Sequence, residues 1–367
     1  MSASRKLKAV GVILLLLSLL ITAFTQTVTA KEVNSCKVCF VHNSFVNDQG
    51  WSYAHQRGVE YLEANSKGVT TAYVDGIFDT GGTDAEKVFH DFAAQGCNII
   101  FGTSYGYNDM LVNVAKKNPD IVFHNYDQYV LTDNAGSHRA HSEEALYLVG
   151  MVAGMKTKSN MIGVVATFPI PQAVREVNAF TLGAQAVNPK TTVKIIWLNS
   201  WYDPPREKES AEALANAGAD VIQSIATSPT VVQICEKLGV YSIGHVNDLR
   251  KFGPKYNLTS MVFEWGTLYQ NITQSVIDKT WKADELWYGL KDGVVTVGAY
   301  GPAVTDKIKQ AVEEMKEKIS SGELDVFAGP LKDQKGKLRI AQGKTMTKKD
   351  LLKIDWFVEG VETTALK

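Results

Sequence analysis

Short apolar segments alternate with longer amphipathic segments along most of the chain. A short apolar run followed by apolar residues at helical spacing is typical of a β-strand and its crossover helix. Repetition of this unit predicts a parallel sheet with helices on both faces. In the first half, the expected strands are 38–41, 70–74, 99–102 and 121–124, and the expected helices are 54–65, 83–95, 108–118 and 142–155.

The same pattern restarts after a polar break at 156–160. The expected strands are then 161–166, 193–198, 221–225 and 241–243, with helices at 171–187, 206–217 and 229–238. Beyond residue 243 the alternation is less regular, with strands expected at 258–264 and 294–299 and helices at 268–278 and 305–319. A remainder of this kind is expected when a chain crosses between two lobes and completes each of them late.

We therefore predict two α/β lobes and a tail. The first lobe is expected to comprise residues 31–157 with about 250–290, and the second residues 158–249 with about 291–330. Residues 331–367 are expected to form a C-terminal tail packed across the lobes.

The amino-terminal residues have the order of a secretory signal peptide. Basic residues within 5–8 precede an uncharged run at 9–25, and small residues at 28–30 offer a cleavage site. This order predicts a signal peptide over residues 1–30 and a periplasmic or other extracytoplasmic location. The apolar run is nearly long enough to span a bilayer, so an uncleaved anchor is the alternative. Cys36 lies too far beyond the run to predict lipid attachment.

Charge and cysteine content narrow the functional classes. The chain has 38 basic and 39 acidic residues, and they are interspersed, which does not favour a nucleic acid or an anionic membrane surface as partner. Four cysteines are too few for a disulfide framework and do not supply a structural zinc site. Cys36 and Cys39 are three apart on a strand and so point to opposite faces. Cys36 and Cys97 precede two predicted strands and are either a disulfide pair or plain core residues.

Aromatic and polar residues gather where the predicted strands end. Ligands of open α/β sheets bind outside the carboxyl ends of the strands. Aromatic faces there supply stacking area, and carboxylate or amide groups can pair with the edge of a flat ring. The candidate faces are Trp51, Tyr105, Phe168, Trp201 and Trp265, and the candidate edge-reading groups are Asp127, Asn247, Asp248 and Glu264. The alternative for each aromatic side chain is core packing, most of all for Tyr105 and Trp201.

Six stretches spread over nearly the whole chain carry a family resemblance. They are 47–51, 100–107, 168–171, 197–204, 329–331 and 355–361. With them the chain resembles the basic membrane protein family, which contains the substrate-binding proteins of ABC transporters and the purine nucleoside receptor lipoproteins. The resemblance implies the type I periplasmic binding protein fold: two Rossmann-like lobes with parallel sheets, joined by a three-crossover hinge, with the ligand between them. It also implies an ABC transporter permease as partner.

The resemblance also assigns roles to individual residues. It implies that Trp51 and Phe168 cover the faces of the base, with Ser52 where relatives often have asparagine. It places acidic residues at Asp127 and at Asp248, beside Asn247. Where nucleoside-binding relatives carry a lysine expected to contact ribose, this chain reads Phe263-Glu264-Trp265. This departure favours a free base over a full nucleoside.

The sequence thus predicts a monomeric solute-binding protein of an ABC importer for an adenine-like purine base or a purine nucleoside, with no cofactor and no metal. One alternative is a ligand-sensing subunit of a signalling receptor. Another is an extracytoplasmic nucleosidase, but the acidic candidates lie on separate strands and the common hydrolase motifs are absent from the sequence. We therefore expect a binding protein and not an enzyme.

Overall fold

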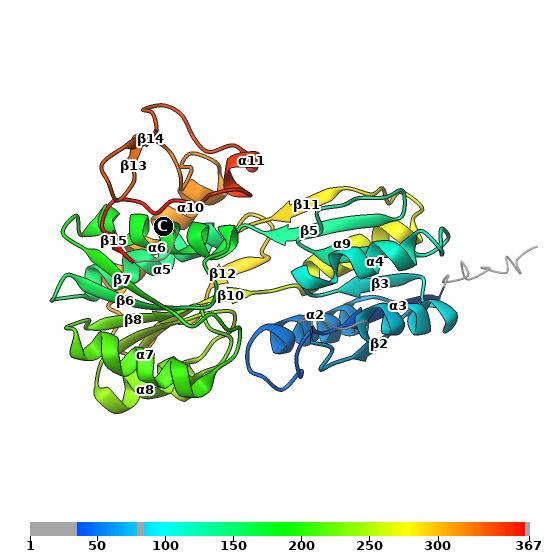
Figure 1. The fold of residues 1–367 in the computed structure, drawn as a ribbon, viewed down its shortest axis with the longest axis horizontal. Helices are drawn as coiled ribbons and strands as arrows, with labels where there is room; N and C mark the ends of the chain where they lie inside the picture. Colours follow the sequence, from blue (N-terminus) through cyan, green and yellow to red (C-terminus); the bar gives the residue numbers. More distant parts are fainter. Residues whose placement is uncertain (1–34, 79–83, 364–367) are drawn as a thin grey trace, which may run out of the picture. The chain divides into compact units, whose positions relative to one another are not determined.

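Two β-sheets, each covered by helices, organise the chain (Figure 1). The computed structural model describes residues 35–78 and 84–363, so the expected signal peptide over 1–30 lies outside the described residues. The first sheet has the order β11-β5-β4-β3-β1-β2, and all its neighbours run parallel. Its strands are β1 (Cys36–Val41), β2 (Val69–Val74), β3 (Ile99–Gly102), β4 (Val122–Tyr126), β5 (Ala135–Ala140) and β11 (Glu285–Tyr288).

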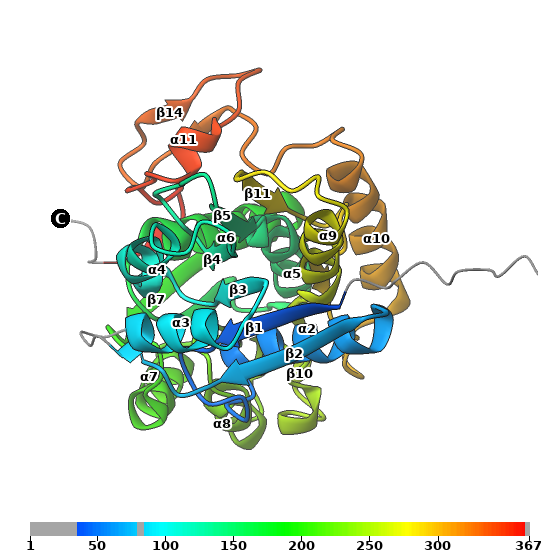
Figure 2. The ribbon, with the colours of Figure 1, turned by 90° about the vertical axis from the view of Figure 1, so that its right-hand side faces the viewer.

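Helices cover both faces of the first sheet because strands such as β1 are apolar on both faces. They are α2 (Trp51–Asn65), α3 (Asp84–Ala94), α4 (Asn108–Ala115) and α9 (Gly266–Ile277), with the short 3₁₀ helix η1 (Tyr105–Tyr107) before α4. Val38 and Phe40 belong to the same core cluster as residues of α2 and α9. Cys39 and Val41 belong to the cluster formed with α3 and α4. Figure 2 shows α3 and α4 on one side of β1 and β3, and α9 on the other.

The second sheet has the order β12-β10-β9-β8-β6-β7-β15, in which only the β10–β12 pair is antiparallel. Its strands are β6 (Met161–Ala166), β7 (Thr192–Trp197), β8 (Val221–Ser224), β9 (Tyr241–Gly244), β10 (Asn257–Phe263), β12 (Val295–Val297) and β15 (Val361–Glu362). Its helices are α5 (Ser142–Lys156), α6 (Pro171–Val187), α7 (Pro204–Asn216), α8 (Thr230–Leu238) and α10 (Asp306–Ser320), with the 3₁₀ helix η2 (Arg250–Phe252) after β9.

Helices α5 and α6 pack closely against each other. A Cβ atom on Gly150 would lie 2.2 Å from the carbonyl oxygen of Phe180, and one on Gly183 would lie 1.9 Å from that of Tyr147. Glycine is required at both positions because the two helix backbones approach each other there. Helix α5 is buried along most of its length, and it also contacts β10 and α10.

The chain passes between the two sheets three times, after β5, after β10 and between β11 and β12. Strand pairing corrects two of the expected lobe boundaries. The strand expected at 258–264 was assigned to the first lobe, but β10 pairs with β9 in the second sheet. Helix α5 was likewise expected in the first lobe, but it packs on α6. The polar break at 156–160 was misleading because it follows α5, whereas the chain crosses before this helix.

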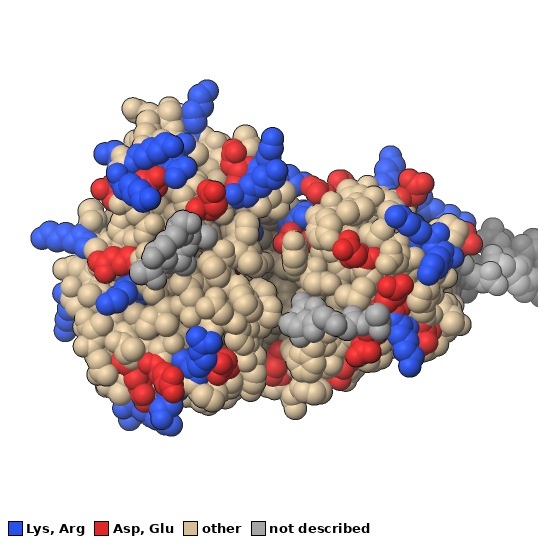
Figure 3. Space-filling model, viewed as in Figure 1, with Lys and Arg blue, Asp and Glu red and all other residues tan. Residues whose placement is uncertain are grey.

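The C-terminal segment contains β13 (Leu331–Lys332), β14 (Leu338–Ile340) and α11 (Lys348–Leu351). Its end is fixed to the second sheet by the pairing of β15 with β7, and Asn178 of α6 donates to the carbonyl oxygen of Trp356 at 2.9 Å. Lys348 of α11 forms an ion pair with Glu285 of β11, so the tail also contacts the first sheet. In Figure 3, basic side chains gather over this tail, and both signs are mixed over the rest of that face.

The disulfide joins Cys39 to Cys97, so the expected Cys36–Cys97 alternative is wrong. Cys39 faces the cluster that contains α3 and α4, and Cys97 comes from the turn after α3 and belongs to the same cluster. Cys36 points to the opposite face of β1 and stays free and buried. Within residues 35–78 and 84–363, no helix is both long and apolar enough to span a membrane.

Candidate ligand-binding site

Loops at the carboxyl ends of the parallel strands carry the candidate residues from both sheets. These loops come from the first sheet after β1, β3 and β4, and from the second after β6, β7, β9 and β10. The two groups of loops meet: Asn247 Nδ2, after β9, donates to the carbonyl oxygens of Gln49 at 3.0 Å and Gly50 at 2.7 Å, after β1. A Cβ atom on Gly50 would lie 1.9 Å from the carbonyl oxygen of Thr227, after β8. The candidate site therefore lies where loops of both sheets converge.

Trp51 is the first residue of α2 and is half-buried. Its Nε1 donates to the carbonyl oxygen of Thr103 at 2.7 Å, which fixes the orientation of the indole. The rings of Tyr126 and Phe263 meet it edge to face, with centroid distances of 4.7 and 5.5 Å. The part of the ring that these neighbours leave uncovered is a rigid aromatic surface on which a flat ligand can stack.

Ser52 was expected at the ligand site, but its side chain is fully buried and bonds to the loop after β1. Its Oγ accepts from the backbone N–H of Ser44 at 3.1 Å and donates to Asn43 Oδ1 at 3.3 Å. Asp48 accepts from the backbone N–H groups of Gly50 at 2.7 Å and Ser52 at 3.1 Å, so a carboxylate stands at the start of α2. Ser52 therefore holds the loop that positions Trp51.

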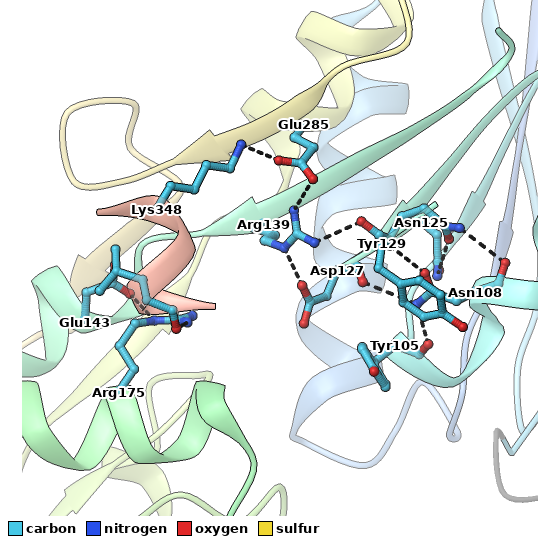
Figure 4. Close-up of polar contacts among 12 residues, drawn as sticks. Tyr105, Asn108, Asn125, Asp127, Tyr129, Arg139, Glu143, Arg175, Glu285 and Lys348 are labelled. Atoms are coloured by element: carbon cyan, nitrogen blue, oxygen red, sulfur yellow. Dashed lines mark hydrogen bonds and ion pairs between the residues drawn. The ribbon is translucent and has the colours of Figure 1, made fainter. Parts of the chain in front are cut away.

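Asp127 follows β4 at a positive φ of 54°, a conformation that aspartate tolerates better than most residues. Its Oδ1 accepts from Arg139 Nε, and Arg139 Nη2 donates to the carbonyl oxygen of Gln128 at 2.9 Å. Glu285 links Arg139 to Lys348, which completes a line of alternating charges (Figure 4). The bond to Arg139 uses Oδ1, so Oδ2 of Asp127 stays outside this bond.

Three of the other candidate aromatics keep exposed surface, so the core-packing alternative does not apply to them. Tyr105 in η1 is 55% exposed and lies beside Tyr129, with ring centroids 6.0 Å apart. Trp201 is 39% exposed and meets the half-buried Phe168 edge to face at 4.9 Å. Thr227 Oγ1 donates to the carbonyl oxygen of Trp201 at 2.8 Å, which ties the loop after β7 to the loop after β8.

Asn247 and Asp248 are already occupied by protein partners. The amide of Asn247 accepts from Arg57 Nη1 at 3.0 Å in addition to its bonds with the loop after β1. Asp248 pairs with Arg250, whose Nη2 lies 2.7 Å from Oδ2. Burial acts to raise the pKa of Asp248, but the hydrogen bonds and charge of Arg250 outweigh it and hold the pKa below its ordinary value. Asn247 therefore joins the two sheets, and Asp248 stays ionised.

Trp265 and Glu264 do not lie as expected. Trp265 is fully buried: it stacks on His55 at 4.7 Å and on Phe263 at 4.9 Å, so it supports Trp51 from behind and offers no face to a ligand. Successive side chains point to different sides of an extended chain, so Glu264 is exposed where its neighbour Trp265 is buried. Glu264 pairs with Arg57. It lines a surface pocket formed with Glu60, Tyr61 and the start of α9. The position of Glu264 does not support its expected role in reading a base edge.

The rings of Trp51, Tyr126, Phe263 and Trp265 form an aromatic cluster. Two buried polar residues beside this aromatic cluster were not among the sequence candidates. Glu176 of α6 is 1% exposed, and its Oε1 accepts from Ser142 Oγ at 2.8 Å and from Gln172 Nε2 at 3.0 Å. His245 follows β9 and is 6% exposed, with Nε2 3.7 Å from Glu176 Oε2 and its ring 6.3 Å from that of Phe263. Neither ring nitrogen of His245 has a hydrogen-bond partner among the described residues. The adjacent charges Arg175 and Glu176 within an apolar helix were the sequence signal for this cluster.

Charged side chains associated with both sheets influence Tyr126 at the end of β4. Arg175 of α6 and Glu143 of α5 form a buried ion pair with Nε and Oε2 3.0 Å apart (Figure 4). Burial raises the pKa of Tyr126 well above its ordinary value, and the charges of Asp127 and Glu176 raise it further, whereas that of Arg175 acts in the opposite direction. Charged side chains at the end of β4 and in the first turns of α6 therefore influence the same tyrosine. In the described parts of the chain, no group of three His, Cys, Asp or Glu side chains is arranged to hold a metal ion.

Known proteins share both the sequence pattern and the fold. Residues 35–328 match the family model Bmp, described as ABC transporter substrate-binding protein PnrA-like. A purine-binding protein of Brucella abortus is 36% identical over 89% of this chain and 93% of its own length. A Haloferax volcanii protein with the provisional name ABC transporter glucose-binding protein is also 36% identical, over 81% of this chain and 75% of its own length.

A solved structure confirms the two-lobed α/β fold that the family resemblance implies. An ABC transporter solute-binding protein from Conexibacter woesei superposes with a TM-score of 0.69 and 21% identity, covering 79% of this chain and 98% of that one. The family match spans most of the described residues. The chain thus belongs to the Bmp family of ABC transporter substrate-binding proteins.

Proposed function

We propose that this protein binds an adenine-like purine base between its two lobes and delivers it to the permease of an ABC importer. The observation that carries the proposal is the half-buried Trp51 ring, fixed by Thr103, together with the unpaired ring nitrogens of His245. The rings of Trp51 and His245 both lie close to that of Phe263. A neutral heteroaromatic ligand needs an apolar face for stacking and hydrogen-bonding groups in the plane of its ring. This part of the molecule supplies both.

The names of the relatives leave two ligand classes to compare. The Brucella protein is named for purines, and the Haloferax protein carries a provisional glucose name at the same identity. A sugar needs many hydrogen bonds to its hydroxyl groups, and the usual groups for this purpose are amides and carboxylates. Here the Asn247 amide is bound to α2 and its preceding loop, and Asp248 is paired with Arg250. These bonds favour a purine over a sugar.

The segment 263–265, where nucleoside-binding relatives are expected to carry a lysine, also bears on the choice between a free base and a nucleoside. Phe263 and Trp265 are buried in the aromatic cluster, and Glu264 pairs with Arg57 on the surface. These positions of the chain therefore supply no free cation of the kind expected to contact ribose. We propose that the free base binds more tightly than its nucleoside.

Closure of the lobes is the proposed mechanism. The ligand would contact loops of both sheets, so its binding energy favours the closed arrangement, which the permease then recognises. Export through the signal peptide and a monomeric state complete the proposal. A sensing subunit would bind the same ligand at the same site, and the loss of import in a strain lacking the permease would distinguish transport from sensing.

Replacing Trp51 with alanine is expected to weaken adenine binding by roughly 1–3 kcal/mol, the range measured for stacking of a base on an aromatic side chain. The protein is expected to remain folded, because Trp51 is only half-buried. Isothermal titration calorimetry measures the affinity and thermal melting checks the fold.

The matched control is Trp51→Phe, which keeps a smaller aromatic face and loses the bond to Thr103. It is expected to retain more affinity than the alanine variant. Unchanged affinity in Trp51→Ala together with a large drop in melting temperature would assign Trp51 to core packing instead.

A further inference from the structure

His245 and Glu176 are buried side by side with hydrogen-bonding capacity left over. Both ring nitrogens of His245 lack partners among the described residues, although the side chain is 6% exposed. The hydrogen bonds to Glu176 from Ser142 and Gln172 both reach Oε1, whereas Oε2 lies 3.7 Å from His245 Nε2. Buried polar groups of native proteins are usually paired, so the unpaired nitrogens of His245 point to a ligand.

These two groups differ in what they can offer. Burial lowers the pKa of His245 although the nearby Glu176 charge opposes this, so the imidazole is neutral near pH 7 and carries one N–H donor. The Oε2 atom of Glu176 offers a hydrogen-bond acceptor. A ligand that satisfies both groups must present a donor to Glu176 Oε2 and, next to it, an acceptor to the histidine N–H.

His245 also lies near the proposed stacking surface on Trp51. The His245 ring lies 6.3 Å from Phe263, and Phe263 lies 5.5 Å from Trp51. From the first sheet, Tyr126 and Asp127 lie within the electrostatic influence of Glu176 and Arg175. A base stacked on Trp51 would therefore direct one edge toward His245 and Glu176.

We infer that Glu176 and His245 form the edge of the site that selects a 6-aminopurine over a 6-oxopurine. This inference rests on the proposed purine-binding function. In adenine, the amino group on C6 is a donor beside the ring acceptor N1, which matches the carboxylate and the histidine N–H. In hypoxanthine, a carbonyl oxygen replaces the amino group and N1 carries a proton, so both positions are reversed. The carbonyl oxygen would then face the Glu176 carboxylate.

The test is calorimetry with adenine and hypoxanthine on ligand-stripped wild-type protein and on Glu176→Gln. The wild type is expected to prefer adenine by about ten- to hundredfold, the range for a hydrogen bond to a charged group. Glutamine keeps an oxygen for Ser142 and Gln172 but replaces the second acceptor with an N–H donor. The substitution is therefore expected to reduce the adenine preference at least about tenfold.

Glu207→Gln is the matched control, because Glu207 is a buried carboxylate of α7 that accepts from Ser228 Oγ. It is expected to leave the adenine-to-hypoxanthine ratio unchanged. His245→Phe is a second variant, which removes the donor but keeps a ring of similar size. It is expected to weaken adenine binding about tenfold or more.

Each outcome has a distinct meaning. If the wild type binds no purine, the proposed function itself is wrong. If it binds adenine and hypoxanthine equally well, purine binding stands and the selectivity inference is overturned. The inference is also overturned if Glu176→Gln and His245→Phe keep the wild-type preference for adenine. Because the wild-type ratio is measured without any substitution, the inference can be rejected even if a variant does not fold.

Discussion

Replacing Glu143 with alanine is expected to lower the free energy of unfolding by about 3–5 kcal/mol, the usual cost of removing one partner of a buried ion pair. Glu143 and Arg175 are 4% and 5% exposed, and Nε and Oε2 are 3.0 Å apart. Burial alone would raise the pKa of Glu143, but the charge of Arg175 and the bond with His141 lower it to about 2. Without Glu143, a buried guanidinium loses its closest opposite charge.

Urea denaturation of the variant and the wild type measures this difference. The control is Glu212→Ala, which breaks an exposed pair with Lys208 one helical turn away. Exposed pairs of this type contribute little, so the control is expected to change stability by no more than about 0.5 kcal/mol. A Glu143→Ala protein as stable as the control would show that the buried pair does not hold α5 and α6 in place.

Mild acid is expected to destabilise the protein strongly, because several histidines are buried in their neutral form. Burial lowers the pKa of His42 to about 4 and that of His124 to about 3, and it lowers those of His55 and His138 well below the ordinary value. The unfolded chain takes up these protons near pH 6.5, whereas the folded chain does not. Stability is therefore lost as the pH falls below about 6.5, down through the folded pKa values.

Relative to pH 7, each such histidine is expected to lower the free energy of unfolding at pH 5 by about 2 kcal/mol. Each pH unit below 6.5 contributes about 1.36 kcal/mol to this loss. His141 acts in the opposite direction: despite its burial, the bond and charge of Glu143 raise its pKa. Chemical denaturation at pH 7, 6 and 5 measures the net effect. In His124→Phe the slope between pH 6 and 5 is expected to be shallower than in the wild type. Equal stability at pH 7 and pH 5 would contradict buried neutral histidines.

The strand and helix pattern was largely predictable from the sequence because most strands are apolar runs between amphipathic helices. Strand β5, with the sequence Ala-Gly-Ser-His-Arg-Ala, was missed because its buried polar residues give no apolar run. Its absence from the expected pattern also hid the first crossing between the sheets. Side chains alternate along β1, so Cys36 and Cys39 point to opposite faces of the sheet. Cys39 is the one that shares a core cluster with Cys97 and pairs with it.

The site was predictable only in part. The placement of Trp51, Asp127 and Phe168 near one another was predictable because they follow strands whose carboxyl ends meet in this fold class. The role of Ser52 depends on the path of the loop after β1, and that of Glu264 on the direction in which one side chain points after β10. Neither follows from residue type. His245 and Glu176 were missed because their proximity arises from the packing of α6 beside the end of β9.

Thermal melting of ligand-stripped protein shows whether the site binds a purine base, with adenine, adenosine, hypoxanthine, inosine and glucose as the panel of ligands. Adenine at a hundred times its dissociation constant is expected to stabilise the folded state by about 2.7 kcal/mol. Adenosine is expected to need a higher concentration than adenine for the same shift. A shift with glucose and none with any purine or nucleoside would contradict the proposed ligand class.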